Sequence, residues 1–74
     1  LGVPYYPPVF PATGIVSTRG GVLNVRRAPN MTSAVIGTLP NGRPVKIIGA
    51  LNGWYAIEFK NTTGYVSAGN ISRN

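Results

Sequence analysis

Apolar and polar residues alternate over short stretches from Gly14 onward, and turn-forming residues separate these stretches. Alternation with a period of two is typical of strands that bury one face, and no ten-residue stretch carries helical periodicity. The pattern predicts strands at 15–18, 23–26, 35–39, 44–50, 55–60 and 64–67, with a short closing piece around Ile71. Short, closely spaced strands suit a barrel, which leaves few sheet edges exposed. The sequence therefore predicts an all-β fold, a small barrel of five to seven short strands, over residues 14–74.

The hairpin that contains the Asn-Gly turn signal allows two registers. A two-residue loop would place Ile47 opposite Glu58 and mix apolar with charged residues on one face. A three-residue loop over 51–53, with its glycine at positive φ, instead pairs Ile47 with Ile57 and Lys46 with Glu58. Register follows the hydrophobic pattern wherever one face is buried, so we predict the three-residue loop.

The next hairpin fits the same two faces. A four-residue loop over 60–63 pairs Ile57 with Val66 inside and Glu58 with Tyr65 outside. The strand before this loop then points three residues inward, namely Tyr55, Ile57 and Phe59.

Trp54 and Tyr65 face outward in this arrangement, and two interpretations of Trp54 remain open. Trp54 either half-buries at a bulge and plugs the barrel rim, or it forms an aromatic wall with Tyr65 that is exposed to a ligand. Aromatic rings with a polar tip and little conformational entropy suit the second use.

The composition narrows the chemistry. The chain has 74 residues, enough for one small domain, and it contains no Cys, no His and no Asp, so that Glu58 is the only carboxylate side chain. A Ser-His-Asp triad, a carboxylate pair for glycoside hydrolysis and a His/Cys/carboxylate metal site cannot be built from these residues. We therefore expect no enzyme activity in this chain, no cofactor and no metal.

Seven Lys and Arg side chains give a formal net charge of +6. This charge either only keeps the domain soluble or attracts an anionic partner, such as a phosphate-bearing wall polymer or a nucleic acid. Basic grooves with aromatic stacking platforms hold single-stranded nucleic acids, but the basic residues of this chain are scattered along the sequence. Nucleic acid is therefore the less favoured partner.

Residues 1–13 hold four of the seven prolines and no charged side chain. Proline at this density favours extended structure over helix, so the segment is a linker or an apolar extension. Because flexible linkers are usually polar, we predict that Tyr6 and Phe10 pack on protein, in this chain, in a second copy or in a neighbouring domain. Oligomerisation through this segment is one consequence. We expect no membrane span, and the opening Leu1 suggests a piece of a longer protein.

Four stretches resemble, in order and spacing, the bacterial SH3 (SH3b) domain family. They are LNVRRAP at 23–29, VIGTLPNGRPVKI at 35–47, NGWYAI at 52–57 and TGYV at 63–66, and the match extends from Leu23 to Ile71. The resemblance implies an SH3-like barrel with core residues at Leu23, Val25, Val45, Ile47, Ile57 and Val66.

The resemblance also implies a binding site and a setting. It places Trp54 and Tyr65 at the edge of a groove, and Arg26, Arg27 and Asn30 in or beside the long loop next to that groove. Such domains accompany cell-wall hydrolases and hold the catalytic domain on peptidoglycan, often through its peptide part. The implied function is a targeting module of the bacterial envelope or exterior. A domain that instead packs on its own catalytic partner and shapes its active site is equally compatible.

Overall fold

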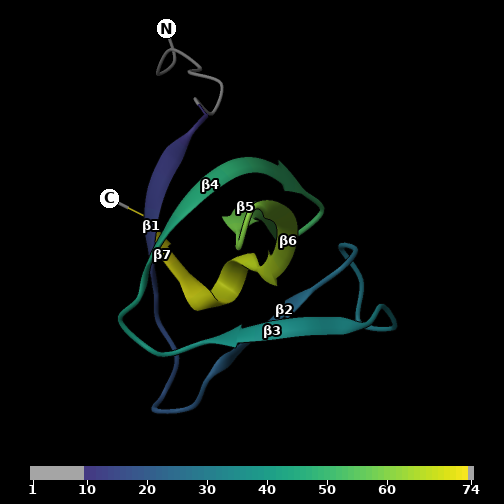
Figure 1. Ribbon diagram of the computed structural model, residues 1–74. Coiled ribbons are helices and arrows are strands. Elements are labelled where there is room, and N and C mark those ends of the chain that lie inside the picture. The colour runs from purple at the N-terminus through teal and green to yellow at the C-terminus, as the bar shows by residue number, and fades with distance from the viewer. Residues whose placement is uncertain (1–9, 74) are drawn as a thin grey trace, which may run out of the picture.

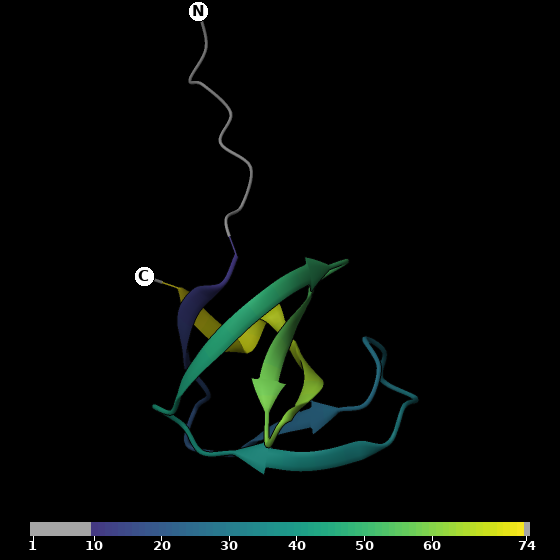
Figure 2. The same ribbon diagram turned by 45° about the horizontal axis from the view of Figure 1, so that its top comes forward.

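The computed structural model describes residues 10–73 of the chain, and this part forms one antiparallel sheet of seven strands with a single short 3-10 helix. The elements in chain order are β1 (Ala12–Val16), β2 (Leu23–Arg26), β3 (Val35–Leu39), β4 (Pro44–Leu51), β5 (Trp54–Phe59), β6 (Thr62–Ser67), η1 (Ala68–Asn70) and β7 (Ile71–Arg73). The strands lie in the spatial order β3-β2-β6-β5-β4-β1-β7. Figures 1 and 2 show the sheet curling on itself, so that β2 and β3 face β4 across the interior. The predicted all-β small barrel is confirmed.

The core lies inside the curled sheet and takes residues from every strand. Its buried side chains are Val16, Leu23, Val25, Leu39, Val45, Ile47, Ile57, Phe59, Val66 and Ile71. All six positions at which the family resemblance implies core residues are among them. Because a 74-residue domain buries a smaller fraction of its surface than a larger domain does, these ten side chains supply most of its hydrophobic stabilisation.

The first strand lies earlier than the hydrophobic pattern predicts. We expected it at 15–18, whereas β1 ends at Val16 and begins at Ala12. It pairs with β4 on one side, with Ala12 opposite Ile47, and with β7 on the other, with Val16 opposite Ile71. Two neighbouring strands therefore hold a segment whose small residues carry little strand signal of their own.

The β4–β5 hairpin corrects the predicted loop but keeps the predicted faces. The loop has two residues, Asn52 at φ 48° and Gly53 at φ 85°, as in a type I′ turn. A β-bulge at Ile48 then absorbs one residue, and beyond it Ile47 lies opposite Ile57 as predicted. The Lys46–Glu58 ion pair is present, with 3.3 Å between Lys46 Nζ and Glu58 Oε2. The predicted three-residue loop was wrong because the bulge allows the favoured two-residue turn while Ile47 and Ile57 both stay on the buried face.

The predicted register of the β5–β6 hairpin was also wrong, by two residues. The loop is the pair 60–61, with both residues at positive φ, rather than 60–63. Consequently Ile57 lies opposite Gly64 instead of Val66, and Glu58 opposite Thr63 instead of Tyr65. A shift of two residues preserves the side-chain alternation, so the inner and outer faces stay as predicted.

The lack of a side chain at Gly64 explains why β5 and β6 pair in this register. A Cβ atom added at Gly64 would overlap Cγ1 of Val25, which is fully buried. The absent side chain at position 64 is therefore the space into which Val25 packs. This contact comes from a strand far away in sequence, which the hairpin alone does not reveal.

Phe10 is the first residue of the N-terminal segment that the structure describes. This ring packs against the core cluster of its own chain, and the Arg73 guanidinium carbon lies 5.7 Å from the ring centroid. The predicted packing of Phe10 is thus confirmed within the chain, whereas Tyr6 lies outside the described residues. Among residues 10–73 there is no helix that is long and apolar enough to cross a membrane.

Candidate functional site

Trp54 and Tyr65 lie on the outer face of the sheet, as the strand alternation predicts. Trp54 begins β5 opposite Ser67 of β6, and Tyr65 lies opposite Ala56, so the two aromatic residues are diagonal neighbours. Both side chains are half-buried. Arg26 of β2 lies opposite Tyr65 on the other side of β6. The sheet therefore brings three of the five predicted site residues onto one continuous surface.

A hollow of about 190 Å³ opens beside Trp54, and we call it the Trp54 hollow. Its lining comes from β2, β5, the end of β6, η1 and two loops, and consists of Val22, Leu23, Asn24, Arg26, Met31, Trp54, Ser67 and Asn70. Two apolar side chains of the lining are largely exposed, Met31 at 70% and Val22 at 61%. Tyr65 does not line this hollow and instead extends the same surface beyond Arg26.

Arg26 lines the hollow and also forms hydrogen bonds with the neighbouring loop between β2 and β3. Its Nη1 donates hydrogen bonds to the carbonyl oxygens of Met31, at 3.0 Å, and Ser33, at 2.9 Å. Hydrogen bonds from a charged donor to carbonyls are stronger than neutral ones. Arg26 therefore holds the loop between β2 and β3 in the position that brings Met31 to the hollow.

Asn30 stabilises the same loop from within. Its Oδ1 accepts hydrogen bonds from the backbone N–H of Thr32, at 3.1 Å, and from the Thr32 hydroxyl, at 3.0 Å. The Ser33 hydroxyl closes the turn by donating toward the carbonyl oxygens of Ala28 and Asn30. Asn side chains commonly fix turns in this way. Asn30 is therefore engaged with its own loop and does not line the Trp54 hollow.

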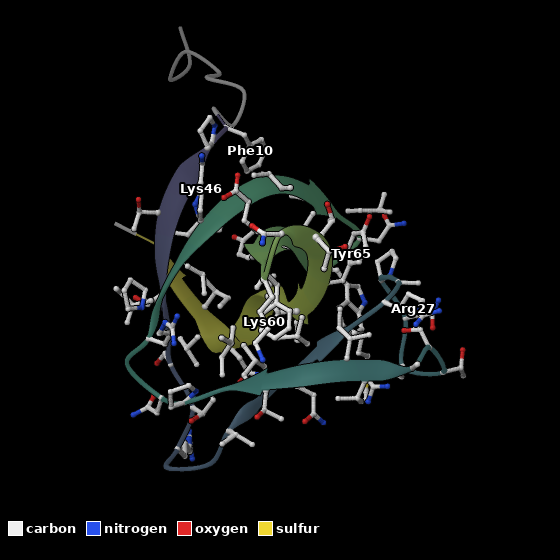
Figure 3. All side chains as sticks on the ribbon, in the orientation of Figure 1. Phe10, Arg27, Lys46, Lys60 and Tyr65 are labelled. Carbon is white, nitrogen blue, oxygen red and sulfur yellow. The ribbon has the colours of Figure 1, made fainter. Side chains whose placement is uncertain are left out.

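Arg27 is exposed and points away from the hollow's lining. Figure 3 shows it out on the β2–β3 loop, and its backbone N–H donates to the carbonyl of Ala34. The structure thus brings Trp54 and Arg26 to the hollow, Tyr65 beside it, and leaves Arg27 and Asn30 on the loop that borders it.

Besides Leu23, which the sequence places in the core, five residues that line the hollow were missed in the sequence, namely Val22, Asn24, Met31, Ser67 and Asn70. Asn24 could have been found, because it alternates with the buried Leu23 and Val25 and so faces outward. Val22, Met31 and Asn70 lie in or next to irregular segments, where no periodicity marks the direction of a side chain. Only the folded arrangement brings them to Trp54.

The lining defines what the hollow can do chemically. Val22, Met31 and Trp54 offer apolar contact, while Asn24 and Asn70 offer amide donors and acceptors. Within residues 10–73 no group of His, Cys, Asp or Glu side chains could hold a metal ion. A hollow that offers apolar and polar groups side by side suits recognition of a small group with both characters, such as a peptide unit with a short side chain.

Comparison with protein families matches residues 21–72 to the bacterial SH3 domain. The match begins just before β2 and ends inside β7, and it includes every residue that lines the Trp54 hollow. A comparison with curated proteins yields no match.

Proposed function

The chain belongs to the bacterial SH3 domain family, and from this premise we propose that it is a non-catalytic module that holds a bacterial envelope protein on the cell wall. The ligand we propose is the peptide part of peptidoglycan, bound at the Trp54 hollow. The parent protein would carry a separate wall hydrolase domain, which this module positions on its substrate outside the cell membrane.

The observation that supports this proposal is the surface around Trp54. A half-buried aromatic ring lies beside two largely exposed apolar side chains, Met31 and Val22, in a hollow that also offers amide groups. Exposing apolar side chains together costs free energy in a free domain, and such clusters mark binding surfaces. Peptide stems of peptidoglycan present short apolar side chains and amides, which match this lining.

Substitution of Trp54 tests the proposal. Truncating a central aromatic contact typically costs about 2 kcal/mol or more, or some thirtyfold in affinity. Trp54→Ala should therefore lower binding to purified cell-wall sacculi and to a soluble muropeptide by about thirtyfold. Because Trp54 lies outside the core, its removal should cost only about 1 kcal/mol of stability.

Leu51→Ala is the matched control. Leu51 is an exposed apolar residue at 54%, opposite Trp54 at the end of the hairpin, and does not line the hollow. Binding by Leu51→Ala should equal that of the unmodified domain. If the Trp54→Ala variant folds and still binds sacculi normally, the ligand does not bind at the Trp54 hollow. Unfolding of Trp54→Ala would make Trp54 a rim plug, and tighter binding to single-stranded DNA than to sacculi would favour the nucleic-acid function.

A further inference from the structure

A second hollow lies on a different part of the barrel and is rich in positive charge. Its volume is about 370 Å³, and it lies among β3, β4 and the end of β5. Its lining includes three cations, Arg43, Lys46 and Lys60, together with Glu58 and Phe59. We call it the basic hollow. It shares no lining residue with the Trp54 hollow.

The charges in the basic hollow do not balance. Three cations face one carboxylate, so the local excess is two positive charges, and Glu58 is the only acidic side chain in the whole sequence. Lys46 pairs with Glu58 at 3.3 Å, but both side chains remain more than half exposed, at 53% and 59%. An exposed pair of this kind contributes at most about 1 kcal/mol, so an arriving anion can compete with Glu58 for Lys46.

Lys60 determines which kind of anion fits. Its Nζ lies 5.3 Å from the centroid of the Phe59 ring, and Phe59 itself is only 7% exposed. The one aromatic ring of the hollow is therefore covered by protein and by a cation. Sites for single-stranded nucleic acids typically combine a basic groove with open aromatic faces on which bases stack. The basic hollow instead suits a phosphate backbone that carries no bases.

Two of the three cations, Lys46 and Lys60, lie apart from each other in the hollow. Figure 3 shows Lys46 beside β4 and Lys60 well apart from it, in front of the barrel. Separated cations match repeated phosphates along a polymer better than one free phosphate ion. The neighbouring hollow, which shares Glu58, Phe59 and Lys60, adds the hydroxyl groups of Thr62 and Thr63.

We propose that the basic hollow binds the phosphate groups of a polyol-phosphate polymer, with Arg43, Lys46 and Lys60 as the contacts. Phosphate binding here is independent of the Trp54 hollow, whereas the cell wall as the source of the polymer rests on the proposed function. Two ligand sites on one small domain would raise retention on a wall that presents both ligands, through effective concentration.

Calorimetric titration of the full chain with poly(glycerol phosphate) oligomers tests the proposal, beside inorganic phosphate and oligothymidylate at the same salt. A cation near an anionic surface contributes about 1 kcal/mol, or roughly fivefold in affinity. Arg43→Gln and Lys60→Gln should each weaken oligomer binding about fivefold, and Glu58→Gln should strengthen it by a similar factor. Inorganic phosphate should bind more weakly than the oligomer.

Arg27→Gln is the control, because it removes the same charge from outside the hollow. Its oligomer affinity should stay within about twofold of the unmodified domain. Equal loss in Arg27→Gln and Arg43→Gln would show that net charge alone drives binding and would overturn the proposal. So would a Glu58→Gln variant with unchanged affinity, or tighter binding of oligothymidylate than of the polyol phosphate. Trp54→Ala should bind the oligomer normally, which separates this site from failure of the wall-peptide function.

Discussion

Substituting Gly64 by Ala tests the packing that selects the β5–β6 register. An added Cβ would overlap Cγ1 of Val25, a fully buried side chain that cannot turn away into solvent. Overpacking a filled core costs about 1–3 kcal/mol. A domain of 74 residues has a total stability of only about 4–11 kcal/mol, so this single methyl group should remove a large share of it.

Gly49→Ala gives the reference that isolates this overlap. A Cβ at Gly49 would meet only the Cβ of Ala56, at an ordinary 3.7 Å, and neither Gly49 nor Gly64 has a left-handed φ. Both substitutions lower the entropy of the unfolded chain by the same amount, which stabilises by about 0.4–1 kcal/mol and cancels in the comparison. The difference of about 1–3 kcal/mol between the two variants is therefore the cost of the contact with Val25.

Urea denaturation followed by circular dichroism measures this difference. With an m value of about 1 kcal/mol/M, the Gly64→Ala midpoint should fall about 1–3 M below that of Gly49→Ala. The double variant Gly64→Ala, Val25→Ala should be less destabilised than the sum of its parts, by about 0.5–3 kcal/mol, because the smaller side chain admits the new methyl group. Equal midpoints for the two single variants would refute the packing and would point to a register with Gly64 in a loop.

Two further substitutions probe the core and the loop beside the Trp54 hollow. Ile57→Ala, at a fully buried position, should cost about 2–5 kcal/mol by urea denaturation, and a near-normal midpoint would mean that the faces of β5 are reversed. Arg26→Ala should cost about 1–2 kcal/mol and speed amide hydrogen exchange at Arg27, because the loop loses two charge-assisted hydrogen bonds. The exposed neighbour gives the control: Arg27→Ala should change stability by less than about 0.5 kcal/mol, and equal effects at both positions would contradict the role of Arg26.

The alternation of apolar residues determined most of the fold. Buried strands must place side chains on one face with a period of two, so the two faces of β5 and the Ile47–Ile57 pairing follow from the sequence alone. Five of the predicted strands lie within a few residues of β2 to β6. The outward direction of Trp54, Tyr65 and Arg26 follows from the same alternation, because each is next in sequence to a side chain that points inward.

The lengths of the two loops and the pairing of β5 with β6 depended on tertiary structure. A bulge at Ile48 allows a two-residue turn and a buried face together, and nothing in a local pattern marks where a bulge lies. The β5–β6 register depends on Val25 packing over Gly64, a contact between strands distant in sequence. β1 is a strand because β4 and β7 flank it on both sides.

The two hollows show the same division between sequence and tertiary structure. The sequence supplies Trp54, an excess of cations and a single carboxylate, which favours a binding surface over catalysis. Only the curled sheet brings Met31 to Trp54 and places Arg43, Lys46 and Lys60 along one hollow with Glu58. The periodicity of a strand determines the face on which a side chain lies, but the closure of the barrel decides which side chains from loops and distant strands become its neighbours.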